Sequence, residues 1–173
     1  MDHRQLLADA AQRPVDTART VLDGITPEAL HAMPERRGNS IAWLVWHAAR
    51  QMDAQLADLV QEEQVWVRGG WADKLGVERG PHSFGFGDDS GAVGELRVTD
   101  PDALCDYLAA VVDALVAYTD TLSEEDLDVV VDDSWDPPTT RGVRIISLID
   151  DAVAHLGQAA YARGLVEGWR IGY

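Results

Sequence analysis

Apolar residues recur with the spacing of amphipathic helices in four long segments of the chain. With their caps included, these segments predict helices at about residues 4–22, 39–60, 100–122 and 143–168. Pro14 lies inside the first segment, where it predicts either a kink or a later start of the helix. Alternation with a period of two residues is too rare to predict a sheet, so the pattern indicates an all-α fold.

The residues at the ends of these segments are typical helix start and stop signals. Asn39 or Ser40 can cap the second helix, and Asp100 followed by Pro101 is a strong start for the third. Gly168 is a suitable stop for the fourth. The predicted boundaries therefore rest on capping chemistry as well as on periodicity.

The connections between the predicted helices differ in length. Those at residues 22–34 and 119–131 are short, and each predicts a capped helical turn, with Ser123 and Asp126 forming a capping box. The connection at residues 66–99 is long and glycine-rich, which is typical of a functional or partly disordered segment. It also provides enough chain for a crossover connection in a helical bundle.

Composition and charge narrow the class of protein. The chain has 173 residues, of which 46% are hydrophobic, so we expect a single folded domain over residues 1–173. Its 30 acidic and 14 basic residues give a net charge of −16, which predicts no binding to nucleic acid or to anionic membranes. We find no transmembrane or signal segment, so a cytoplasmic location is expected.

Asp151 and His155 are the first candidates for chemistry. They lie four residues apart, so a helix presents their carboxylate and imidazole on one face, as metal chelation requires. They flank an apolar stripe, and we expect them to border a cavity between helices. The stripe consists of Ile145, Leu148, Ala152, Leu156 and Ala159.

His47 is the natural third ligand, because Trp43 and Trp46 flank it on a helix that should pack nearby. Two imidazoles and one carboxylate leave coordination positions open, as in catalytic metal sites. Two other interpretations remain. The Asp-x-x-x-His pair is also typical of a solvated surface pair, and an isolated histidine is often a core residue.

Two motifs resemble a known family. "SIAWLVWHAARQMDAQL" is similar to the second helix of the DinB-like superfamily, nearest the branch that includes the N-terminal domain of mycothiol-dependent maleylpyruvate isomerases, and "DDAVAHLGQAAYARGL" resembles its last helix. In that branch one histidine and a Glu-x-x-x-His pair bind a divalent metal. The resemblance places these ligands at His47, Asp151 and His155. It also implies a four-helix bundle whose long second connection crosses the bundle end.

The chain departs from this branch at one ligand, since Asp151 replaces the usual glutamate and is one methylene shorter. Gly157 and Gln158 match the His-x-Gly-Gln form of the family helix, and the small Gly157 predicts close approach of a neighbouring helix.

Further residues are weaker candidates for binding a cofactor or ligand. Arg50 and Gln51 follow His47 by one turn and either orient a ligand or face solvent. His82 could reach the metal from the loop, or be an exposed loop histidine, and Gln158 follows His155. The segment "FGFGDDSG" predicts a turn or lid, because it is acidic and lacks the lysine of a phosphate loop.

The resemblance implies a divalent-metal enzyme, with zinc as the first candidate and nickel or another ion as alternatives. A low-molecular-weight thiol such as mycothiol would then serve a transferase or isomerase acting on a small molecule. Isomerase activity itself is not assumed, because the C-terminal domain of the full isomerases has no counterpart here. The alternatives are a metal-dependent hydrolase and a non-catalytic ligand-binding or interaction bundle. A homodimer is expected, and no catalytic residue beyond the metal ligands is assigned.

Overall fold

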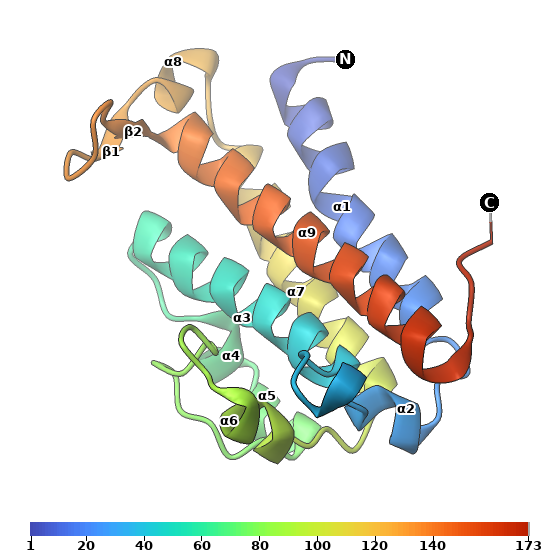
Figure 1. The fold of residues 1–173 in the computed structure, drawn as a ribbon. Helices are drawn as coiled ribbons and strands as arrows, with labels where there is room; N and C mark the ends of the chain where they lie inside the picture. Colours follow the sequence, from blue (N-terminus) through green and yellow to red (C-terminus); the bar gives the residue numbers. More distant parts are fainter. Residues whose placement is uncertain (173) are drawn as a thin grey trace.

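The computed structural model describes residues 1–172, and Figure 1 shows the path of the chain. Within these residues, four long helices form a bundle: α1 (His3–Leu22), α3 (Ile41–Val60), α7 (Pro101–Thr119) and α9 (Arg141–Glu167). The prediction of an all-α four-helix bundle is confirmed. Helix α1 continues through Pro14, so the alternative of a later start is wrong.

The predicted caps are present at the ends of the long helices. Ser40 caps α3 by accepting a hydrogen bond from the amide of Trp43, which decides between Asn39 and Ser40. Asp100 caps α7 in the same way. Gly168 ends α9 in the left-handed conformation at φ +68°, as a C-terminal glycine does. Local chemistry therefore sets these ends.

The bundle has one crossover connection. Helices α1 and α9 run in one direction and α3 and α7 in the other (Figure 1). Helix α3 packs against α7 and α9, and α1 packs against the same two helices, so α1 and α3 lie on opposite corners. Because α3 and α7 run in the same direction, the chain between them must return along the length of the bundle.

This returning connection has defined structure. It contains the short helices α4 (Val65–Arg68), α5 (Trp71–Leu75) and α6 (Ser90–Glu95). Helix α4 contacts α3 and α7, and α5 contacts α7. The connection therefore covers the side of the bundle (Figure 1), whereas the family resemblance predicted a crossing at its end.

The shorter connections contain the predicted helical turns. Helix α2 (Pro27–His31) is capped by Thr26 and is followed by the 3₁₀ turn η1 (Pro34–Arg36). Helix α8 (Glu124–Leu127) starts with the predicted capping box between Ser123 and its third helical residue.

A small hairpin follows α8, although no sheet was predicted. Strands β1 (Val130–Asp132) and β2 (Thr139–Thr140) pair antiparallel. Strands of two and three residues are too short to show alternation, which is why the pattern missed them. The hairpin lies beside the start of α9 and contacts it.

Helix α3 is buried on nearly all sides over residues 41–53. An apolar stripe predicts only one buried face, but α7, α9 and the returning connection enclose this helix together. Four polar side chains are therefore buried along with the apolar ones. They are His47, Arg50, Gln51 and Asp53.

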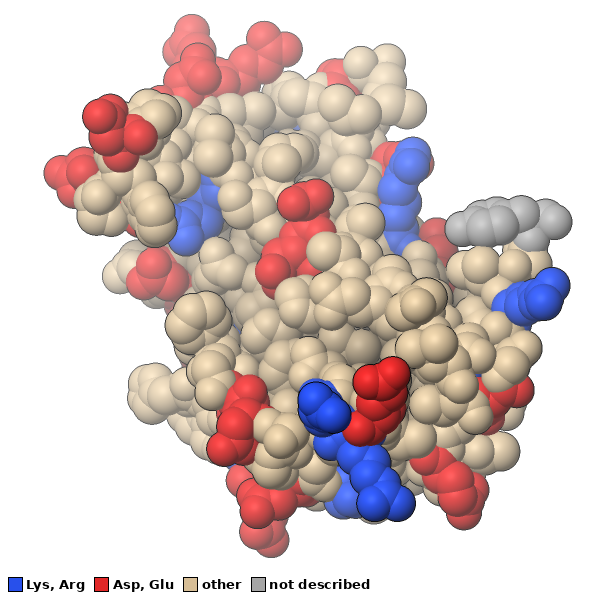
Figure 2. All heavy atoms as spheres, in the orientation of Figure 1, with Lys and Arg blue, Asp and Glu red and all other residues tan. Residues whose placement is uncertain are grey.

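The surface is acidic, as the composition requires. Acidic side chains are scattered over the face shown in Figure 2 and are more numerous there than basic ones. Among residues 1–172, no helix is long and apolar enough to cross a membrane.

Candidate metal centre

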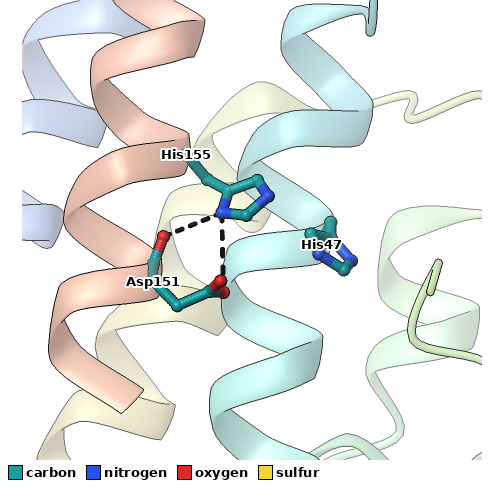
Figure 3. A group of neighbouring side chains, drawn as sticks. All are labelled: His47, Asp151 and His155. Atoms are coloured by element: carbon teal, nitrogen blue, oxygen red, sulfur yellow. Dashed lines mark hydrogen bonds and ion pairs between the residues drawn. The ribbon is translucent and has the colours of Figure 1, made fainter. Parts of the chain in front are cut away.

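The two packed helices α3 and α9 bring the three predicted ligands together. His47 comes from α3, and Asp151 and His155 come from α9 (Figure 3). One ligand atom from each residue lies within 4.8 Å of the other two. The rings of His47 and His155 meet edge to face, with their centroids 4.6 Å apart. The group could therefore hold a divalent metal ion.

Hydrogen bonds decide which ring nitrogen of each histidine is available. His47 donates from Nδ1 to the carbonyl oxygen of Phe84. His155 donates from Nδ1 to the carbonyl oxygen of Asp151, at 2.8 Å. In neutral imidazole this assignment leaves the lone pair on Nε2 in both rings. Histidine ligands of metals are usually held in this way, with the other nitrogen donating to a carbonyl.

Asp151 supplies an oxygen that has no partner. Its Oδ2 atom is buried and accepts no hydrogen bond from the described residues. Nδ1 of His155 lies 3.5 Å from this oxygen, but its proton goes to the closer carbonyl of Asp151. A buried carboxylate oxygen without a partner is costly, and a bound cation would satisfy it. This orphaned atom fits a metal ligand.

Burial lowers the pKa of His47 below its ordinary value, because the charged imidazolium is poorly solvated there. The hydrogen bond to Phe84 and the carboxylate of Asp151 oppose this shift, whereas His155 adds to it. The result favours the neutral imidazole near pH 7, which is the form that binds metals.

A second layer of residues holds His47 in place. The Trp43 ring stacks on its imidazole, with centroids 4.5 Å apart and an angle of 11° between the planes. Trp43 Nε1 donates a hydrogen bond to Asp88 Oδ2 at 2.9 Å, and Arg79 Nη1 donates to both carboxylate oxygens of Asp88. These contacts attach the loop at residues 80–89 to α3, beside the imidazole.

Gly85 lets this loop approach the imidazole closely. It has a φ of +90°, a conformation that favours glycine. A Cβ atom at this position would lie 2.9 Å from Nδ1 of His47 and 3.0 Å from ring atoms of Trp43 and Trp46. The glycine therefore allows the neighbouring Phe84 carbonyl to reach Nδ1.

We predict that Gly85→Ala lowers zinc affinity roughly 10- to 100-fold, as loss of an outer-shell contact does. The added methyl group must displace His47 or the loop. Gly87→Ala is the matched control, because Gly87 also has a positive φ of +82° but a Cβ atom there would meet nothing within 4 Å. Calorimetric zinc titration of both variants checks this, and equal affinities would contradict the role given to the loop.

A pocket of about 690 Å³ begins one helical turn from His47 along α3. Gln51, which follows His47 by four residues, lines its inner part. Residues of the second half of α3, Arg144 of α9 and strand β1 form its walls, and Phe84 and Phe86 border it from the loop. None of the three candidate ligands lines this pocket, so it is not the cavity that Asp151 and His155 were expected to border.

Of the weaker candidates, Gln51 lines this pocket and the others do not. Arg50 is fully buried, and all its hydrogen bonds go to protein acceptors, including the carbonyls of Pro81 and Ser83. Gln51 is buried as well, so facing solvent is wrong for both residues. His82 and Gln158 are exposed.

Gly157 does not have the role predicted for it. It is exposed, and a Cβ there would meet no atom within 4 Å. Gly157 follows His155 by two residues and so points away from the neighbouring helix.

Sequence reasoning missed the Phe84 carbonyl and the Asp88–Arg79 pair. Trp43 and Asp88 are 45 residues apart, and their contact depends on the path of the returning connection. The only signal was the glycine-rich segment itself, which predicted a turn or lid without a partner.

Comparisons with known proteins show the family and the fold of the chain. The family model of the DinB superfamily matches residues 11–159. A crystal structure described as the conserved protein of a locus from Enterococcus faecalis is 34% identical, with a TM-score of 0.89 over 98% of this chain and 99% of that chain. No curated protein matches the chain. The matched residues span most of the bundle and include all three candidate ligands. The chain therefore belongs to the DinB superfamily.

Proposed function

We propose that the protein is a divalent-metal-dependent enzyme, with zinc as the first candidate, that uses a low-molecular-weight thiol. The triad carries this proposal: both imidazoles have free Nε2 lone pairs, a buried carboxylate oxygen lacks a partner, and one ligand atom from each residue lies within 4.8 Å of the other two. Two nitrogens and one oxygen form a donor set typical of catalytic zinc sites, which keep a further position open.

Each residue has a definite task in this proposal. His47 and His155 would hold the cation through Nε2, and Asp151 through Oδ2. The Phe84 and Asp151 carbonyls keep the protons on Nδ1, so both imidazoles stay neutral donors. A metal bound there would lower the pKa of a coordinated thiol or water and so would produce a nucleophile at neutral pH.

The resemblance of the two helix motifs to the mycothiol-dependent branch favours a thiol over water. The reaction would then be a transfer or isomerisation of a small molecule, and mycothiol is the thiol that this branch implies. The pocket beside the triad gives a small-molecule substrate room to bind.

Calorimetric titration of zinc-loaded protein with mercaptoethanol and then with mycothiol tests this proposal. We expect saturable binding with release of about one proton per thiol, because the thiol binds as thiolate. Metal-free protein is the control and should bind neither compound.

A zinc-loaded protein that binds no thiol would remove the thiol and leave metal-dependent hydrolysis, in which water takes its place. A protein that retains no metal would contradict the proposal of a metal-dependent enzyme. It would favour the alternative of a non-catalytic ligand-binding bundle.

A further inference from the structure

Two pairs of polar residues connect α3 and α9 at the pocket, and we call these pairs the first and the second layer. In the first layer, Gln51 Nε2 donates a hydrogen bond to the carbonyl oxygen of Leu148 at 3.3 Å. In the second layer, Arg144 Nη1 donates to Oε1 of Gln55 at 3.3 Å. Arg144 lies seven positions before Asp151 on α9, which is about 10 Å along the helix axis. The second layer is therefore about two helical turns from Asp151 along α9.

Arg144 is the one cation among the described residues that line this pocket. Its Nη2 donates to Oδ2 of Asp132 at 2.9 Å, and its side chain is 27% exposed. A guanidinium has five N–H donors, and two of them are used by Asp132 and Gln55. The other three have no acceptor among the described residues, so they are available to a ligand.

The two acids in the pocket lining do not block such a ligand. Asp132 is already paired with Arg144, and this contact holds the guanidinium in one orientation. Asp58 lies three residues beyond Gln55 on α3, on the side away from the triad. An anionic group can therefore meet Arg144 from the side of the metal ligands.

The hairpin gives this arrangement its second wall. Asp132 belongs to β1, and its Oδ1 accepts hydrogen bonds from the amide and hydroxyl of Ser134. The same strand brings Val131 to the pocket, which Phe84 and Phe86 of the loop also line. Apolar side chains thus line the pocket together with Arg144.

We propose that Arg144 anchors a carboxylate of the small molecule that occupies this pocket. The ligand class is an elongated organic acid, with its acidic end on Arg144 and a metal-binding donor at its other end, because Arg144 and Asp151 are about two helical turns apart on α9. This inference rests on the proposed function, because the donor end requires the metal. The apolar middle part of this organic acid contacts Phe84 and Val131.

Two probes of equal length test the anchor on zinc-loaded protein by calorimetry: ω-mercaptohexanoate and ω-mercaptohexanol. We expect the carboxylate to bind roughly tenfold or more tightly than the alcohol, which is the usual gain from a charge-assisted hydrogen bond. Arg144→Gln should abolish this preference. Asp132→Asn is the matched control, because it breaks the same ion pair but keeps the cation, and it should preserve or increase the preference.

Equal binding of both probes, or an equal effect of Arg144→Gln on both, would overturn the anchor. If neither thiol binds although zinc is retained, the thiol part of the proposed function fails. The comparison is then made with the monohydroxamate of octanedioic acid and with octanohydroxamate, whose head groups bind zinc without a thiol. A carboxylate preference that depends on Arg144 would support the anchor there, and its absence would overturn it.

Discussion

Asp53→Ala is expected to lower the free energy of unfolding by about 3–5 kcal/mol, because it leaves the buried guanidinium of Arg50 without a counter-ion. The Asp53 carboxylate is 1% exposed and accepts hydrogen bonds from four donors. Two are the amides of Val65 and Trp66 at the start of α4, at 2.8 and 2.7 Å. The others are the Tyr107 hydroxyl at 2.8 Å and Arg50 at 3.3 Å.

The effect should reach the metal centre as well as the stability. Arg50 donates to the carbonyls of Pro81 and Ser83, which belong to the loop at residues 80–89 that contacts His47. Losing the Asp53 contact frees Arg50 to move and so loosens that loop. Asp53 thus supports the site from a distance.

Equilibrium unfolding in guanidinium chloride checks this prediction, with Asp58→Ala as the matched control on the same helix. Asp58 is exposed, so its replacement should change stability by less than about 0.5 kcal/mol. A cost below about 1 kcal/mol for Asp53→Ala would contradict the buried network.

Much of the fold could be predicted because its signals are local. The long helices follow from apolar spacing, and Ser40, Asp100, Ser123 and Gly168 act as caps where the sequence predicts them. A cap depends on residues three or four positions away, so no knowledge of the tertiary structure is needed.

The buried polar network could not be predicted in the same way. Arg50 and Asp53 lie on the side of α3 that an apolar stripe predicts to be exposed. They are buried because the returning connection covers that side, and this follows from tertiary packing alone. The hairpin that holds Asp132 was missed because its strands are too short to show a period.

The candidate site was predictable in part. The spacing of Asp151 and His155 on one helix indicates a pair, and the family resemblance adds His47. The outer contacts depend on the loop at residues 80–89, whose conformation no local pattern specifies. Arg144 was not singled out either, because its role depends on the groove between two helices. A homodimer and a cytoplasmic location stay predictions.

Removal of one candidate ligand is expected to weaken zinc binding by more than the roughly 10- to 100-fold typical of an outer-shell change. Asp151→Ala removes the orphaned carboxylate oxygen and leaves the two imidazoles in place. The fold should be retained, because Asp151 Oδ2 accepts no hydrogen bond from the described residues. Asp150→Ala is the matched control, since Asp150 is the adjacent residue, carries the same charge and is exposed.

Elemental analysis of untagged protein tests the metal centre most directly, with the wild type measured beside Asp151→Ala and Asp150→Ala. The account predicts close to one divalent ion per chain in the wild type and in Asp150→Ala, and almost none in Asp151→Ala. Equal metal content in all three proteins, or no metal in any of them, would contradict it.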